Sequence, residues 1–373
     1  MGMWLPAALA FGVTAVLTLT LRPLAIRLHL TDKPGGRKRH IGDVPLVGGI
    51  AMLIGILVAA LISLRLNSHW PFLTSAALLV VVGVLDDRFD VWASVRFATQ
   101  ICAALIMMVA GGLYLRDIGD PFGTGVLGLG FLAIPISVLI ALTVINAFNF
   151  VDGIDGLAAS MAVIALTAGA LAAGLKAPVV ALAAIACGAI LGFLLFNLPT
   201  YRNRHLRTFM GDAGSTLLGF IVVWFTVTIS QGEHRSLSPV AALWFALMPL
   251  SDFFSCFVRR LARRKLPFLP GHDHFHYMLL RAGLTGRQVL AVLVGFALFY
   301  AAVGLVGASL KLPDATLFAP WIALLGLQYF IVKRLALHLR RRRWKASRAV
   351  AVPARAPKAR LHSAQPSTGP RAA

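Results

Sequence analysis

The sequence predicts an all-α protein that crosses a membrane many times, and three observations support this prediction. Of the 373 residues, 58% are hydrophobic and only 13% are charged, against roughly 45–50% and about 25% in soluble domains. The mean hydropathy is +0.82. Apolar runs of membrane-spanning length recur along the chain, separated by polar loops that are mostly short. No separate soluble domain of ordinary size is expected.

Eleven of these runs are expected to form transmembrane helices, because a helix needs about 20 apolar residues to cross the hydrocarbon core. Their cores are residues 3–21, 46–64, 72–85, 97–115, 131–148, 157–175, 179–196, 216–229, 240–258, 289–310 and 315–332. No cation precedes Arg22 and no small-residue cleavage site interrupts the first run, so we expect this run to remain as an anchor rather than act as a signal peptide.

The distribution of Lys and Arg predicts the orientation, since positive residues gather on the cytoplasmic side of a membrane. With the N-terminus outside and the C-terminus in the cytoplasm, 30 of the 35 cations lie in cytoplasmic segments. Ten of the 14 acidic residues lie on that same face. The net charge of +21 is therefore interpreted as a signal of topology, and no nucleic-acid partner is expected.

Three aspartates cluster at the end of the third run, where Asp86, Asp87 and Asp90 form a D-D-x-x-D pattern. A helix C-terminus disfavours negative charge, so the adjacent pair needs a cation. Pairing with Arg88 at a solvated helix end would provide one. A bound metal or a phosphate-bearing substrate with its counter-ion is the functional alternative.

A second polar row ends the fifth run, where Asn146, Asn149, Asp152 and Asp155 recur at every third position. This spacing places the four side chains along one face of a helix. Such groups at membrane depth are costly unless they face a polar cavity, so a functional site is the default interpretation.

Two further loops on the same side carry polar groups. In the loop after Phe209, Asp212 or Ser215 could cap the following helix, or Asp212 could hold Mg²⁺ beside phosphate oxygens at the helix N-terminus. The other loop contains Arg264, three histidines at alternate positions and Arg281. Zinc is one interpretation of the histidines, but the surrounding cations favour a diphosphate.

Taken in order, these blocks resemble the polyprenyl-phosphate N-acetylhexosamine-1-phosphate transferases, membrane enzymes that move a sugar 1-phosphate from a UDP-sugar to a lipid phosphate. The matching blocks are residues 32–49, 86–90, 146–156, 209–215 and the histidine loop. The first loop is closer to the GlcNAc-1-phosphate transferase branch than to the phospho-MurNAc-pentapeptide branch. In the histidine loop, His274 and His276 match two family histidines, whereas Tyr277 replaces the last one and Gly271-His272 replaces an Asp-Arg pair.

The resemblance implies transfer of GlcNAc 1-phosphate from UDP-N-acetylglucosamine to undecaprenyl phosphate, with release of UMP. This would be the first membrane step of a cell-surface polysaccharide of the O-antigen, common-antigen or teichoic type. Another UDP-N-acetylhexosamine or a phospho-MurNAc-pentapeptide donor is the alternative. The implied cofactor is Mg²⁺, with Mn²⁺ as a substitute. The implied location is the bacterial cytoplasmic (inner) membrane, with the active site on the cytoplasmic face, membrane lipids as partners, and a homodimer left open.

The resemblance also assigns roles to individual residues. Asp212 is the expected metal ligand, with Asn149 as a second. The expected catalytic residues are Asp86 and Asp87, which would position the lipid phosphate, and Asp152 and Asp155, which would hold the nucleotide or the metal shell. The expected substrate-binding residues are Asp90, Asn146, Phe209, Arg264, His274, His276 and Arg281. A strong general base is not required, because the second pKa of a phosphate monoester is about 6.

Three other classes share part of this pattern. An intramembrane prenyltransferase uses D-D-x-x-D and N-x-x-D-x-x-D motifs, but it needs neither the Asp212 loop nor the histidine loop. An intramembrane aspartyl protease of the G-x-G-D kind requires glycine where Phe209 stands. A secondary transporter, the non-enzyme alternative, predicts a site near the bilayer midplane and two similar halves, whereas here the polar residues lie towards one face and no repeat is visible.

Two regions are therefore expected: a transmembrane catalytic domain over residues 1–333, with its site on cytoplasmic loops, and a basic, disordered cytoplasmic tail over residues 334–373. After the cationic run from Arg340 to Lys345, the tail is rich in Ala, Pro, Ser and Arg, a composition typical of disordered segments. Its cations would contact anionic lipid headgroups. A role limited to fixing the topology explains them equally well.

Overall fold

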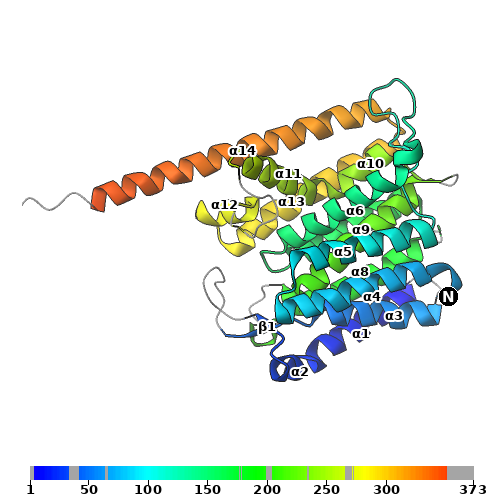
Figure 1. Cartoon of the computed structure of the whole chain (residues 1–373), viewed down its shortest axis with the longest axis horizontal. Coiled ribbons are helices and arrows are strands. Elements are labelled where there is room, and N and C mark those ends of the chain that lie inside the picture. The colour runs from blue at the N-terminus through cyan, green and yellow to red at the C-terminus, as the bar shows by residue number, and fades with distance from the viewer. Residues whose placement is uncertain are drawn as a thin grey trace, which may run out of the picture.

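The computed structural model describes residues 4–32, 42–63, 66–175, 177, 179–198, 204–232, 235–264, 271 and 273–350. These residues form a bundle of helices that run roughly alongside one another, with one small two-stranded antiparallel ribbon near one end (Figure 1). The predicted all-α class is confirmed.

The longer helices follow the predicted apolar runs. In chain order the helices are α1 (Trp4–Thr20), α2 (Arg22–Arg27), α3 (Gly48–Ser63), α4 (Leu66–Phe89), α5 (Ala93–Leu105), α6 (Ala133–Val151), α7 (Leu157–Ala173), α8 (Val179–Asn197), α9 (Gly211–Ser230), α10 (Pro239–Leu243), α11 (Leu247–Leu261), α12 (Phe275–Arg281), α13 (Gly286–Ser309) and α14 (Asp314–Val350). Short 3₁₀ or π turns are η1 (Ile106–Ala110), η2 (Gly130–Leu132), η3 (Arg204–Leu206) and η4 (Trp244–Ala246), and the strands are β1 (Thr31–Asp32) and β2 (Val44–Pro45).

Seven helical segments in the described part of the chain are long and apolar enough to cross a membrane. They are Ala93–Ala110, Gly130–Val151, Val179–Asn197, Gly211–Ser230, Pro239–Leu261, Gly286–Ser309 and Asp314–Leu339. Helices α1, α3 and α7 are apolar but shorter. The chain is therefore a multi-pass membrane protein.

Helix α9 lies at the centre of the bundle, and 89% of an 18-residue apolar stretch within it is buried. Its sequence is apolar on nearly all sides, as expected for a helix surrounded by others. Two glycines allow neighbouring helices to touch its first turn. A Cβ atom on Gly49 of α3 would lie 2.5 Å from the nitrogen of Gly214, and one on Gly83 of α4 would lie 2.4 Å from the Cα of Ala213.

The loop that enters α9 is fixed by backbone hydrogen bonds. Strands β1 and β2 pair with Thr31 opposite Pro45. The N–H of Phe209 donates to the carbonyl of Pro45 at 3.0 Å, and the N–H of Gly48 donates to the carbonyl of Phe209 at 3.0 Å. In Figure 1, β1, α2 and α12 lie towards the end of the bundle opposite the N-terminus. The start of α9 is thus anchored at the end that carries the polar loops.

Helix α14 does not end at the expected boundary after residue 333 but continues to Val350. Residues 334–350 contain no Gly or Pro and are rich in Ala, Leu and Arg, which are good helix formers. A helix of 37 residues is about 55 Å long, well beyond the roughly 30 Å of a hydrocarbon core, and α14 projects past the rest of the bundle (Figure 1). Residues 351–373 of the predicted tail lie outside the described residues.

Candidate active site

The first turn of α9 is capped by a carboxylate from another helix. Asp87 in α4 accepts the N–H of Asp212 at 2.8 Å and the N–H of Ala213 at 3.3 Å. The first N–H groups of a helix lack partners within that helix, and the N-cap residue itself, Met210, makes no side-chain cap. The simpler alternative, in which Asp212 or Ser215 caps this helix, is therefore wrong. Asp87, 125 positions earlier, has that role.

Gly211 makes this approach sterically feasible. Its φ is +69°, a left-handed conformation that favours glycine. A Cβ atom at this position would lie 2.1 Å from Oδ2 of Asp87. The glycine is therefore required both for the turn and for the close contact of the carboxylate.

Asn149, in the last turn of α6, joins the same cluster. Its Nδ2 donates to Oδ1 of Asp212 at 2.7 Å and to Oγ of Ser215 at 2.9 Å. The side chain of Asp212 remains 39% exposed. The two expected metal ligands are thus adjacent, and the Asp212 carboxylate is accessible to a ligand.

Asp86 pairs with an arginine that the sequence motifs did not single out. Its carboxylate accepts from Nη1 of Arg96 at 2.9 Å and from the N–H of Val91 at 2.8 Å. The same Nη1 lies 3.6 Å from Oδ2 of Asp212. The alternative pairing with Arg88 is wrong, because Nε of Arg88 donates to the carbonyl of Leu28 at 2.9 Å. The sequence did contain a signal for this partner: Arg96 is a cation in the first turn of α5, the helix that follows the D-D-x-x-D motif.

Two further aspartates follow α6. Burial raises the pKa of Asp152 to about 8, and the charges of Asp212 and Asp155 add to this effect. Asp155 forms an ion pair with Arg207, whose guanidinium lies 4.8 Å from the centre of the Phe209 ring. One face of the ring expected to stack on uracil is therefore occupied by Arg207.

The histidine loop packs against the turn between α6 and α7. Oδ2 of Asp252 lies 3.1 Å from Nδ1 of His274. Burial alone would lower the pKa of His274, but the Asp252 carboxylate raises it to about 9. The His274 ring lies 5.0 Å from that of Phe150, and a Cβ atom on Gly153 would lie 2.3 Å from Nε2 of His276. Both histidines are buried and contact the turn that carries Asp152.

The contacts around Asp212 join Asp87, Asn149 and Ser215 to it, and we call these four residues the Asp212 cluster. Four expected substrate-binding residues make no described contact with this cluster. Nδ2 of Asn146 donates to Oε1 of Gln100 at 2.7 Å. Asp90 follows α4 and is exposed, with a φ of 53°. Arg264 lies beyond α11 and Arg281 ends α12, and both are exposed. The first-loop segment 33–41 and residues 265–270 and 272 of the histidine loop lie outside the described residues.

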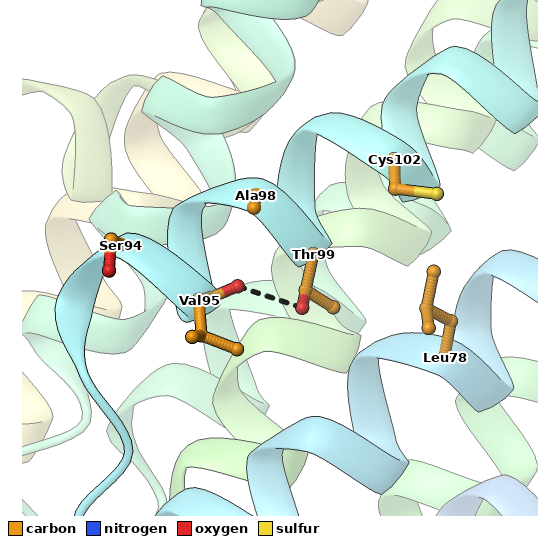
Figure 2. Close-up of a pocket in the computed structure, with 6 residues that line it drawn as sticks. All are labelled: Leu78, Ser94, Val95, Ala98, Thr99 and Cys102. Carbon is orange, nitrogen blue, oxygen red and sulfur yellow. Dashed lines mark hydrogen bonds between the residues drawn. The ribbon is translucent and has the colours of Figure 1, made fainter.

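An apolar groove of about 410 Å³ lies on α4 and α5, on the same helix as Arg96. Its lining residues are Leu78, Ser94, Val95, Ala98, Thr99 and Cys102 (Figure 2). The hydroxyl of Thr99 donates to the carbonyl of Val95 at 2.9 Å, so this polar group is satisfied within α5. The groove therefore presents mainly carbon to its surroundings.

The donor set around Asp212 suits Mg²⁺. Among the described residues no three His, Cys, Asp or Glu side chains form a group that could hold a metal. Mg²⁺ needs fewer protein ligands than that, because it is commonly bound by one or two carboxylates together with substrate phosphates and water. The exposed Asp212 carboxylate meets this requirement. Asn149 turns its Nδ2 toward Asp212 and Ser215, so its Oδ1 is the amide atom left to bind a cation.

Comparisons with known proteins agree with these motifs. The model of glycosyl transferase family 4 matches residues 69–230, from α4 to the end of α9. The chain is 37% identical over 319 residues to an undecaprenyl-phosphate alpha-N-acetylglucosaminyl 1-phosphate transferase of Yersinia pestis, covering 84% of this chain and 87% of the relative. It is 35% identical over 345 residues to the protein of that name from Escherichia coli O157:H7, covering 91% of each chain. The chain therefore belongs to glycosyl transferase family 4, as the resemblance of its motifs predicted.

Proposed function

We propose that this protein transfers N-acetylglucosamine 1-phosphate from UDP-GlcNAc to undecaprenyl phosphate, giving undecaprenyl-diphospho-GlcNAc and UMP. The relatives named for this activity match most of the chain. The observation that carries the proposal is the meeting of α4, α6 and α9 around Asp212, which brings together carboxylate and amide groups suited to a diphosphate-bound cation.

In the proposed reaction, an oxygen of the lipid phosphate bonds to the β-phosphorus of UDP-GlcNAc while the bond from that phosphorus to UMP breaks. One phosphoanhydride replaces another, so little net free energy is required. The barrier is mainly charge repulsion and alignment, which a metal ion and positioned cations relieve. The lipid phosphate is largely dianionic at pH 7, so the attacking oxygen does not need a strong base.

The contacts suggest a division of roles among the acidic residues. Asp212 and Asn149 would hold Mg²⁺, which when bound neutralises the diphosphate. Both oxygens of Asp87 accept backbone N–H groups, so this residue would position the Asp212 turn. Arg96 is 40% exposed between Asp86 and Asp212 and would meet a phosphate. Mn²⁺ would substitute for Mg²⁺, since it accepts the same oxygen ligands.

The membrane arrangement belongs to the same proposal. We infer eleven crossings, because each predicted run coincides with a helical segment. We infer that the N-terminus is outside, because this orientation puts most of the cations on the cytoplasmic side. The site would then face the cytoplasm at the bacterial inner membrane. The groove on α4 and α5 would receive the start of the prenyl chain, whose phosphate would lie near Arg96.

The test is a competition among donors. Membranes containing the protein would be incubated with undecaprenyl phosphate, Mg²⁺ and equal amounts of UDP-GlcNAc, UDP-GalNAc and UDP-MurNAc-pentapeptide, and the lipid fraction analysed by mass spectrometry. We expect GlcNAc as the dominant lipid-linked sugar. A different dominant sugar would overturn the donor assignment. Uptake of UDP-GlcNAc into proteoliposomes without any lipid-linked product would instead support the transporter alternative.

A further inference from the structure

We propose that Asp252 is a positioning residue that holds the histidine loop against the acidic turn between α6 and α7. The kinetic part of this inference rests on the proposed function, whereas its structural part does not. Sequence motifs gave Asp252 no role, because it lies within the ninth apolar run and its partners are 22 and 23 residues further along.

The environment of Asp252 is unusual for a carboxylate. The residue is 1% exposed and lies inside Pro239–Leu261, a segment of membrane-spanning length. An ionisable group at such a place is costly and is found where it has a partner and a function. Here both carboxylate oxygens are used. Oδ2 faces Nδ1 of His274 at 3.1 Å, and Oδ1 accepts the N–H of Phe275 at 2.8 Å.

Both contacts end at the start of α12. His274 is the N-cap residue of that helix and makes no side-chain cap of its own. Asp252 supplies the missing acceptor from α11 and pairs with the imidazole of the same residue. A single carboxylate therefore fixes both the backbone and the side chain at the point where the histidine loop becomes helical.

The histidines transmit this placement to the acidic turn. The rings of His274 and His276 stack with centroids 5.8 Å apart and an angle of 9° between their planes. His274 packs on Phe150, which follows the proposed metal ligand Asn149. His276 rests on Gly153, which follows Asp152. Moving the start of α12 would therefore change what the active-site turn touches.

Ser251 offers a matched control for Asp252. It is the preceding residue in α11, is also 1% exposed, and its hydroxyl donates to Oε1 of Gln328 in α14 at 2.6 Å. Replacing Ser251 breaks an equally buried hydrogen bond but leaves the histidine loop untouched. Any effect specific to the loop should appear with Asp252 and not with Ser251.

The experiment compares Asp252→Asn, Asp252→Glu and Ser251→Ala with the wild type, using the full chain in lipid nanodiscs. Histidines are modified with diethyl pyrocarbonate and each site is quantified by peptide mass spectrometry, with the exposed His205 as the internal reference. Transfer from UDP-GlcNAc to undecaprenyl phosphate gives kcat and KM in the same preparations.

For Asp252→Asn we expect His274 modification to rise about fivefold or more relative to His205. We expect kcat to fall about 10- to 100-fold, a loss of the size seen when a metal-bound histidine loses its carboxylate partner, with KM for undecaprenyl phosphate within about threefold. Asp252→Glu keeps the charge and should recover part of the lost kcat. Ser251→Ala should stay within about twofold of wild type in both measurements.

Unchanged protection of His274 in Asp252→Asn would overturn the inference, as would an equal loss of kcat in Ser251→Ala. If Asp252→Asn fails to fold, Asp252→Glu decides the question: increased modification of His274 with reduced kcat in a folded protein supports the proposal, and wild-type values refute it. If the wild type itself transfers no GlcNAc phosphate, the proposed function fails, and protection of His274 still tests the role of Asp252.

Discussion

Replacing Gly211 by Ala should impair the candidate site without replacing any residue expected to bind the metal or the substrate. Gly211 has a φ of +69°, and the added Cβ atom would lie 2.1 Å from Oδ2 of Asp87. The alanine would therefore both strain the backbone and displace the carboxylate that holds the first turn of α9.

The size of the effect follows from these two contributions. The left-handed conformation costs alanine about 1–2 kcal/mol. Displacing Asp87 weakens its hydrogen bonds from the N–H groups of Asp212 and Ala213, and a hydrogen bond to a charged group contributes about 1.5–3 kcal/mol. Loss of one such bond and the backbone strain together amount to about 3 kcal/mol. If the site must be restored before reaction, kcat falls about 100-fold, since 1.36 kcal/mol is a factor of ten.

The assay is transfer of labelled GlcNAc phosphate to undecaprenyl phosphate, together with thermal unfolding in detergent. Gly295→Ala is the control, because Gly295 lies within α13 and a Cβ atom there would meet nothing within 4 Å. We expect Gly295→Ala to match or slightly exceed wild-type stability and to retain its kcat. A wild-type kcat for Gly211→Ala would refute the requirement for the Asp87 contact.

Three further predictions concern other parts of the chain. Asp90→Asn should keep kcat within about fivefold of wild type, because this exposed side chain lies outside the Asp212 cluster; a loss as large as that of Asp87→Asn in the same assay would place it in the site. The Asp252 carboxylate raises the pKa of His274 from 6.5 to about 9. The pairing of protonated His274 with Asp252 should therefore stabilise the folded protein by about 3 kcal/mol below pH 6.5, and this contribution should be lost as the pH rises through 9. Thermal unfolding midpoints should therefore fall from pH 7 to 9.5 in wild type and much less in Asp252→Asn, and parallel curves would contradict this. Truncation after Lys345 should leave transfer activity intact, as measured in membranes, whereas an inactive truncation would make the end of α14 necessary.

The fold class and the location of the helices could be predicted from the sequence because the apolar runs are long and their boundaries are polar. The Asn149 and Asp212 motifs were also informative, since their side chains meet at 2.7 Å. Composition was less informative about α14. The basic segment after residue 333 was expected to be unstructured, but its Ala, Leu and Arg residues favour a continuing helix.

Partners that are distant in sequence could not be predicted, because one chain gives spacing along a helix but not the packing between helices. Asp87 as the cap of α9 and Arg96 as the partner of Asp86 depend on how α4, α5 and α9 meet. For the same reason, the regular spacing could put Asn146 on one helical face with Asn149 but could not show that its amide donates to Gln100 on α5. Asp252 was overlooked because a single polar residue within an apolar run shows no motif.

The most direct test of the proposed chemistry follows the β-phosphorus of the donor. Purified protein in nanodiscs would receive UDP-GlcNAc labelled at the β-phosphate, undecaprenyl phosphate and Mg²⁺, with Asp212→Asn as the comparison. We predict that the label enters the lipid fraction in equal amount to the unlabelled UMP released, that chelation of Mg²⁺ stops both, and that Asp212→Asn folds but forms neither product. Label that remains in a soluble UDP product, or wild-type transfer by Asp212→Asn, would contradict the account.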